Sequence, residues 1–146
     1  MRNNIAVSNA IGGIGLEDYG QRGLLRGIKI GFNSLYGNEA GGITAPPPGK
    51  LVDIFLVGNV GWTHTNVALF PTKQAGLTES ENLICERGCF ADPERNGYFP
   101  ARQSALDRHR VNFKAGWLPV DDFFGHPRKF PPKVGAVETA AGPMGR

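Results

Sequence analysis

The cysteine pair is the first candidate for chemistry. Cys85 and Cys89 stand four residues apart, in the segment Cys-Glu-Arg-Gly-Cys. A structural zinc site needs four ligands, usually two such pairs or one pair with histidines. The three histidines have no ligand spacing and are scattered along the chain, as His64, His109 and His126. The sequence therefore predicts two half-buried thiols on a bulged strand, with no metal and no cofactor.

A glycine cluster near the start is the second candidate. Gly12-Gly13-Ile14-Gly15 has the composition of a phosphate-binding loop. Such a loop follows a strand and either continues into Lys-Ser/Thr or has the spacing G-x-G-x-x-G. This segment meets none of these conditions, so we expect its glycines to serve tight packing.

Carboxylates and a serine–histidine pair are the remaining candidates for catalysis. Asp121 and Asp122 are adjacent, so their side chains would point apart on a strand, and Asp107 has no visible partner. Acid–base catalysis by two carboxylates needs both in one pocket with separated pKa values. Ser104 and His109 show no sign of a third triad member. The sequence therefore predicts no catalytic residue and no enzyme.

Basic and aromatic residues raise the question of nucleic acid. Small basic clusters occur at 108–110 and 128–133, and the aromatic side chains available for stacking on bases are Trp62, Trp117, Phe123 and Phe124. The formal charge is only +3, whereas a nucleic-acid-binding domain concentrates positive charge on one face. We expect nucleic-acid contact to be incidental, and the arginines of 108–115 to form the solvent face of an alternating strand.

Glycine and proline decide which elements position these groups. The chain has 21 glycines and 11 prolines, which interrupt helices. Eleven glycines fall in residues 1–49, with apolar residues between them. This is too much apolar surface for a linker and too much glycine for a domain. We therefore expect 1–49 to be an extended arm that ends at the proline run 45–49.

The rest of the chain divides into a domain and a second arm. Residues 50–118 contain β-branched and alternating segments, such as 50–57, 62–70 and 108–115, which predict a folded β domain. Residues 119–146 carry five prolines among aromatic residues and predict an extended C-terminal arm. The expected fold is all-β, a small antiparallel Greek-key sandwich with glycine- and proline-rich arms at both ends.

Three segments of the expected domain resemble a known family. Asn66–Phe70, the turn and strand of Ala91–Phe99, and His109–Phe113 are similar to the rhythm of the carboxypeptidase-regulatory-like and transthyretin-like modules. The strand before the Asp-Pro turn departs from the family, since it holds the two cysteines. The resemblance implies a Greek-key sandwich used for adhesion or scaffolding, with no catalytic residues.

These observations together predict a non-enzymatic structural protein of a large assembly. We expect a virion decoration, cement or tail accessory protein that docks by its arms on neighbouring subunits in many copies. The alternative is an accessory subunit of a respiratory, photosynthetic or ribosomal complex in a mitochondrion or plastid. No signal peptide or membrane span is expected, because no apolar run is long enough. Two cysteines with no export signal predict reduced thiols.

Overall fold

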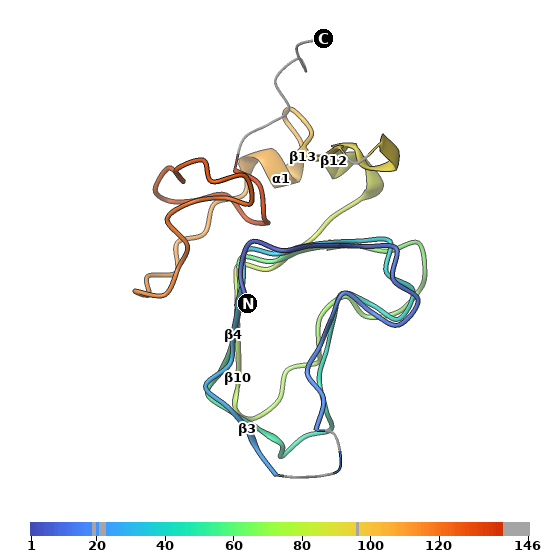
Figure 1. The fold of residues 1–146 in the computed structure, drawn as a ribbon, viewed down its shortest axis with the longest axis vertical. Helices are drawn as coiled ribbons and strands as arrows, with labels where there is room; N and C mark the ends of the chain where they lie inside the picture. The colour runs from blue at the N-terminus through green and yellow to red at the C-terminus, as the bar shows by residue number, and fades with distance from the viewer. Residues whose placement is uncertain (19, 21–22, 96, 139–146) are drawn as a thin grey trace.

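The chain up to Ile84 is a parallel β-solenoid. The computed structural model describes residues 1–18, 20, 23–95 and 97–138. Seen along the solenoid axis, successive coils superpose on one angular outline (Figure 1). The segment 85–138, which we call the cap, leaves the last coil and lies against one side of the solenoid.

Four parallel sheets form the sides of the solenoid. The largest has the order β1 (Ile5–Val7), β5 (Ser34–Tyr36), β9 (Val60–Trp62) and β11 (Leu83–Ile84). The second has the order β10 (Leu77–Ser80), β8 (Ile54–Val57) and β4 (Lys29–Gly31). Two pairs complete the circuit: β2 (Ile14–Gly15) with β6 (Ile43–Thr44), and β3 (Leu25–Arg26) with β7 (Leu51–Val52). Every pairing within the solenoid is parallel and joins successive coils.

A stack of asparagines fixes the register of the coils. Asn4, Asn33, Asn59 and Asn82 lie one above another, at sequence separations of 29, 26 and 23 residues. Each of the first three donates its backbone N–H and its amide Nδ2 to the Oδ1 of the next, at 2.8–3.1 Å. We call this stack the asparagine ladder. The residue before each ladder asparagine has a left-handed backbone, with φ between 55° and 65°, so the chain turns the same corner in every coil.

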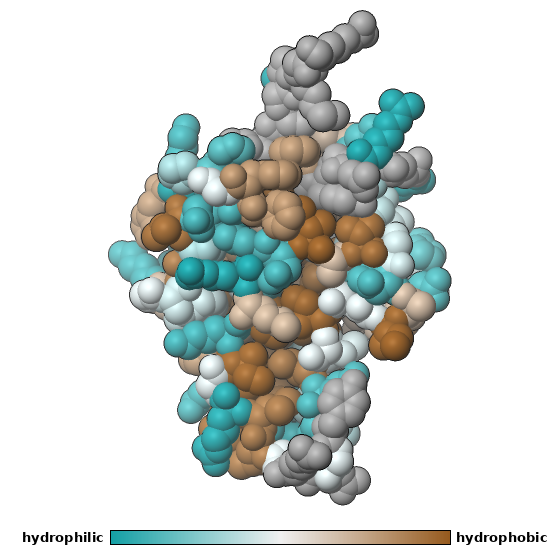
Figure 2. Space-filling model, in the orientation of Figure 1, coloured by the Kyte–Doolittle hydropathy of each residue, from teal (hydrophilic) through white to brown (hydrophobic). Residues whose placement is uncertain are grey.

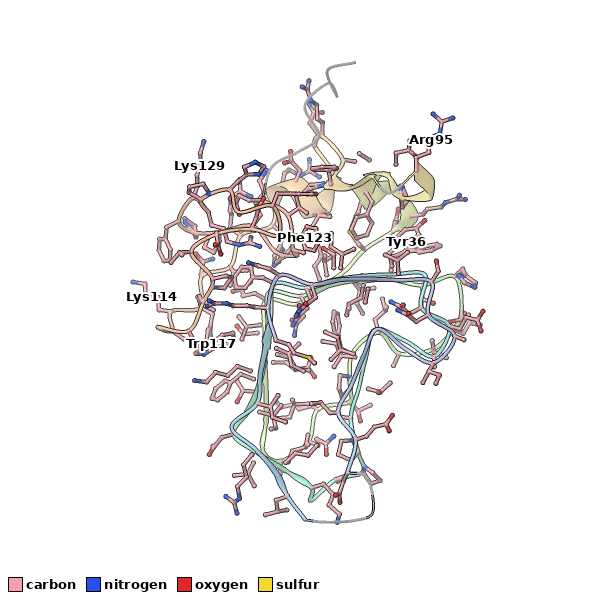
Figure 3. All side chains as sticks on the ribbon, in the orientation of Figure 1. Tyr36, Arg95, Lys114, Trp117, Phe123 and Lys129 are labelled. Atoms are coloured by element: carbon pink, nitrogen blue, oxygen red, sulfur yellow. A yellow bond between two sulfur atoms is a disulfide. The ribbon has the colours of Figure 1, made fainter. Side chains whose placement is uncertain are left out.

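Side chains of the largest sheet face two different cores. Leu35 and other inward residues fill the solenoid together with Ile30, Ile54 and Leu56. The outward residues Tyr36 and Val60 pack instead beneath the cap. Tyr36 stacks on Trp62 at 4.6 Å between ring centroids and lies at the junction of sheet and cap (Figure 3).

The cap combines short elements with irregular chain. It contains the 3-10 turns η2 (Arg87–Cys89) and η3 (Pro93–Arg95), the antiparallel pair β12 (Phe90–Asp92) and β13 (Gly97–Pro100), and helix α1 (Ala105–Arg108). The last part of the cap returns to the solenoid, where Gly135 N–H donates to Gly58 O and Ala136 N–H to Ser34 Oγ. Hydrophobic side chains also reach the surface at the solenoid end that faces the viewer (Figure 2).

The parallel pairing corrects the expected topology. The fold is β-rich as predicted, but its main sheets are parallel, whereas a Greek-key sandwich is antiparallel. The physical reason is the coil: each circuit returns the chain beside its starting point and running in the same direction. Of the segments expected as strands, 62–70 shares only Trp62 with β9. The segment 108–115 contributes the last residue of helix α1 and an isolated bridge at Arg110.

The structure also does not confirm the expected arms. Residues 1–49 supply β1 to β6, and β3, β4 and β5 pair with strands of 50–62. The boundary expected at 45–49 therefore lies within a coil. Residues 119–138 fold back onto the solenoid, and the rest of the expected C-terminal arm, 139–146, lies outside the described residues. The glycines of 1–49 allow coils to approach closely: a Cβ on Gly13 would lie 2.7 Å from Gly42 O, which agrees with the packing role expected for that cluster.

Candidate functional site

The free edge of the last coil is the candidate site. β10 and β11 end the two main sheets on the side of the last coil, as β4 and β1 end them on the side of the first coil. We call the segment 77–84, which contains β10 and β11, the coil edge. After Ile84 the chain turns away into the cap. No described residue pairs with the far side of β10 or β11. The coil edge therefore presents a row of backbone donors and acceptors that can accept another strand.

Inward positions of the solenoid are open at the coil edge. Ile84 is paired with Gly61 of the preceding coil, and Gly61 is paired in turn with Leu35 of the coil before that. Leu35 is fully buried. Ile84 itself is 68% exposed, because no coil covers it. A solenoid normally covers its terminal repeats with a polar cap, and here the cap covers a side of the solenoid instead.

A carboxylate stands in the inward stack at the coil edge. Glu79 is in register with Leu56, and through it with Ile30, and both of these are fully buried. Partial burial raises the pKa of Glu79, while a hydrogen bond with the Asn82 side chain partly offsets that rise. Glu79 thus ends an apolar stack with a charge and contacts the last member of the asparagine ladder.

A disulfide holds the point where the chain leaves the last coil. Cys85 and Cys89 are buried and bonded to each other, with 6.0 Å between their Cα atoms. The expectation of two half-buried thiols is therefore wrong. The sequence predicts reduced thiols because it shows no export signal, whereas the turn at η2 brings the two side chains together across four residues.

Arg128, from the basic cluster at 128–133, is the centre of the cap. Its side chain is 2% exposed and donates to Glu138 Oε2, to Asn3 Oδ1, and to four backbone carbonyls, those of Asp121, Lys133, Gly135 and Ala136. Its guanidinium also lies 4.7 Å from the centroid of the Phe32 ring. Burial lowers the pKa of Arg128, and the charges of Glu138 and Asp122 oppose that shift. The guanidinium therefore fastens the cap to the solenoid and has no donor left for a phosphate.

Two of the carboxylates considered as catalytic candidates, Asp122 and Asp107, instead stabilise the cap through hydrogen bonds and an ion pair. Asp122 is buried and accepts from the backbone N–H groups of Phe124, His126 and Glu138. Burial would raise the pKa of Asp122, but these hydrogen bonds and His126 lower it below its usual range. Asp107 pairs with Lys133, whose hydrogen bond lowers the pKa of Asp107.

Ser104 and His109 do not form a catalytic pair. The Ser104 Oγ accepts from the Asp107 backbone N–H and so caps helix α1. The His109 Nε2 lies 3.3 Å from Glu81 Oε2, at the coil edge. His64 and His126 lie elsewhere, beside Trp62 and Asp122 respectively. Within the described residues no group of three or more His, Cys, Asp or Glu side chains is placed to hold a metal ion.

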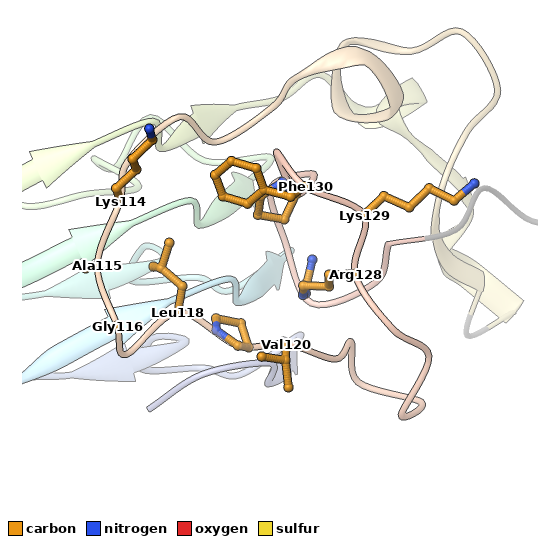
Figure 4. Close-up of a pocket in the computed structure, with 10 residues that line it drawn as sticks. Lys114, Ala115, Gly116, Leu118, Val120, Arg128, Lys129 and Phe130 are labelled. Atoms are coloured by element: carbon orange, nitrogen blue, oxygen red, sulfur yellow. The ribbon is translucent and has the colours of Figure 1, made fainter.

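A second surface feature is a cleft in the cap, of about 580 Å³ (Figure 4). Its walls come from 114–120 and 128–132. Phe130 and Val120 line it and are 72% and 80% exposed. Lys114 and Lys129 also line it and extend outward from the cap (Figures 3 and 4). Its described lining contains no carboxylate, histidine, serine or cysteine, and its ionisable side chains are those of Lys114, Arg128 and Lys129.

Comparison with protein-family models, with curated proteins and with solved structures finds no match for this chain. The resemblance to carboxypeptidase-regulatory-like and transthyretin-like modules therefore stays a prediction. In the part of the chain that the structure describes, no helix is long and apolar enough to cross a membrane.

The functional feature that sequence reasoning missed is the repeat. The asparagines at 4, 33, 59 and 82 are each followed directly by a strand of the largest sheet, of three residues in the first three cases and two in the last. A search for self-similarity at a period of 20–50 residues is the means of finding a solenoid. The shortening separations weaken that signal, because they blur any fixed period.

Proposed function

We propose that this protein is a non-enzymatic structural subunit that joins a larger assembly through its coil edge. The single observation that carries the proposal is the uncovered last coil, where Ile84 occupies an inward position and is 68% exposed. Strand addition would satisfy the edge backbone groups and bury Ile84. Attachment through the coil edge replaces the docking by extended arms that the sequence suggests.

The disulfide favours a particle or surface in an oxidising environment. Disulfides persist in secreted proteins and at virion or cell surfaces, and are rare where thiols are kept reduced. The Cys85–Cys89 bond therefore supports a virion decoration or accessory protein over a subunit on the reducing side of an organelle membrane. Many copies on one particle remain the expected arrangement.

Incorporation of edge variants into the native assembly tests the proposal. Ile84→Asp places a charge on the coil edge, and Val120→Asp is the matched control, an aliphatic residue of similar exposure on the cap. We expect tagged Ile84→Asp protein to sediment as a free subunit, while Val120→Asp and the unmodified chain sediment with the particle. Equal incorporation of both variants would contradict the use of the coil edge.

A further inference from the structure

We propose that the coil edge binds a partner strand that carries a lysine or arginine opposite Glu79, and that an apolar residue at that position weakens binding. This inference rests on the proposed function, because it concerns the chemistry of the same edge. The strand would run parallel to β10 and stack on it as β10 stacks on β8. Its sequence signature would be a basic residue, two further residues, an asparagine, one further residue and then an apolar residue that covers Ile84.

The position of the basic residue follows from the register. In each of the last three coils the inward residue three places before the ladder asparagine joins one stack: Ile30, Leu56 and Glu79. A further coil in the same register would place its own residue directly over Glu79. Burying the Glu79 carboxylate against an apolar side chain would leave a charge without a partner, which is unfavourable. A lysine or arginine at that position would neutralise it.

The asparagine of the signature follows from the end of the ladder. Asn82 Oδ1 accepts from Asn59, and Asn82 Nδ2 donates to Leu56 O at 2.9 Å. The earlier ladder residues also donate to the asparagine of the following coil, whereas no asparagine among the described residues stacks on Asn82. An incoming asparagine would take the donors of Asn82 and release Glu79 from its hydrogen bond with that side chain. Glu79 would then turn to the incoming cation.

Glu79 also explains how an open edge avoids indiscriminate pairing. An inward-pointing charge on an edge strand is one of the devices by which β proteins prevent edge-to-edge association. Glu81, two residues further along, lies beside the cap instead, with 3.3 Å between its Oε2 and His109 Nε2, so the charge in the inward stack is that of Glu79. A basic partner therefore meets favourable charge, whereas an acidic or wholly apolar strand does not, so Glu79 supplies specificity as well as protection.

Peptide binding to the full chain tests this selectivity. The probe is a peptide of residues 28–38 of this sequence, which carries Asn33 and has Ile30 at the position opposite Glu79. Its matched partner is the same peptide with Ile30→Lys. Both are titrated against the unmodified protein and against Glu79→Gln, whose side chain is similar in size and uncharged. Circular dichroism confirms that the variant is folded.

We expect the Ile30→Lys peptide to bind the unmodified protein about tenfold more tightly than the unsubstituted peptide. We expect Glu79→Gln to abolish that preference, and Glu79→Leu to favour the unsubstituted peptide. Equal affinity of both peptides for the unmodified protein would overturn the selectivity and leave strand addition intact. Failure of both peptides to bind would overturn this inference. The proposed function is decided separately, by whether the Ile84→Asp variant is incorporated into the native assembly.

Discussion

Asn59 should be among the most costly side chains in the solenoid to remove. It is fully buried, and its Oδ1 accepts from both the backbone N–H and Nδ2 of Asn33. Its Nδ2 donates to Ile30 O and to Asn82 Oδ1. Asn59→Ala removes these four hydrogen bonds and leaves buried groups of Asn33 and Ile30 without partners. At about 1 kcal/mol for each bond, the expected loss in the free energy of unfolding is about 3–5 kcal/mol.

Denaturant unfolding followed by tryptophan fluorescence measures this loss, since Trp62 lies on β9 three residues after Asn59. Asn112→Ala is the control, because Asn112 is exposed and its removal should change stability by less than about 0.5 kcal/mol. Asn59→Asp should be at least as harmful as alanine, since a carboxylate cannot donate to Ile30 O. A loss below about 1 kcal/mol for Asn59→Ala would refute the view that the ladder holds the coils in register.

Three further outcomes test the cap and the turns. The pKa of Asp122 is lowered in the fold. The stability that its carboxylate contributes should therefore be fully present above the ordinary aspartate pKa and be lost as the pH falls through the lowered pKa. We expect the difference in unfolding free energy between the unmodified chain and Asp122→Asn to shrink in acid. Replacing both Cys85 and Cys89 by serine should cost about 2 kcal/mol, since the disulfide closes a short loop, and reduction of the unmodified chain should cost a similar amount. Gly76→Ala should lower the melting temperature much more than Gly27→Ala does. Both glycines have a left-handed φ, but only at Gly76 would a Cβ collide with the Leu51 backbone. Equal melting temperatures of the two variants would contradict this prediction.

The sequence supported the β-rich character but not the topology. Alternating and β-branched segments such as 54–57 predict strands correctly, because side-chain pattern is a local property. Whether those strands pair in parallel or antiparallel depends on how the chain returns, and here that return is set by corners at residues such as Phe32 and Glu81. These are not glycines, yet both adopt positive φ, so local propensity gives no sign of the turn.

The same limit applies to the candidate sites. The predictions against zinc, phosphate-loop and triad chemistry used only residue spacing, whereas the use of Ser104 as a helix cap became visible only in the structure. Burial of Arg128 could not be predicted, because its partners Asn3 and Glu138 are remote from each other in sequence. The exposure of Ile84 could not be predicted either, since it depends on the chain leaving the solenoid one residue later.

Glycine content and coil geometry have a common physical cause. Close stacking of the first coils leaves no room for side chains at Gly13 and Gly42, where a Cβ would lie 2.7 Å from Gly42 O and 2.5 Å from Leu69 O respectively. Apolar residues such as Ile14 and Ile43 then fill the interior between them. A segment with much glycine and much apolar surface is thus what a solenoid coil requires, because neighbouring coils supply the burial that a single coil lacks. The last coil has a neighbour on one side only and leaves its inward Ile84 68% exposed, so the coil edge is where a partner is expected.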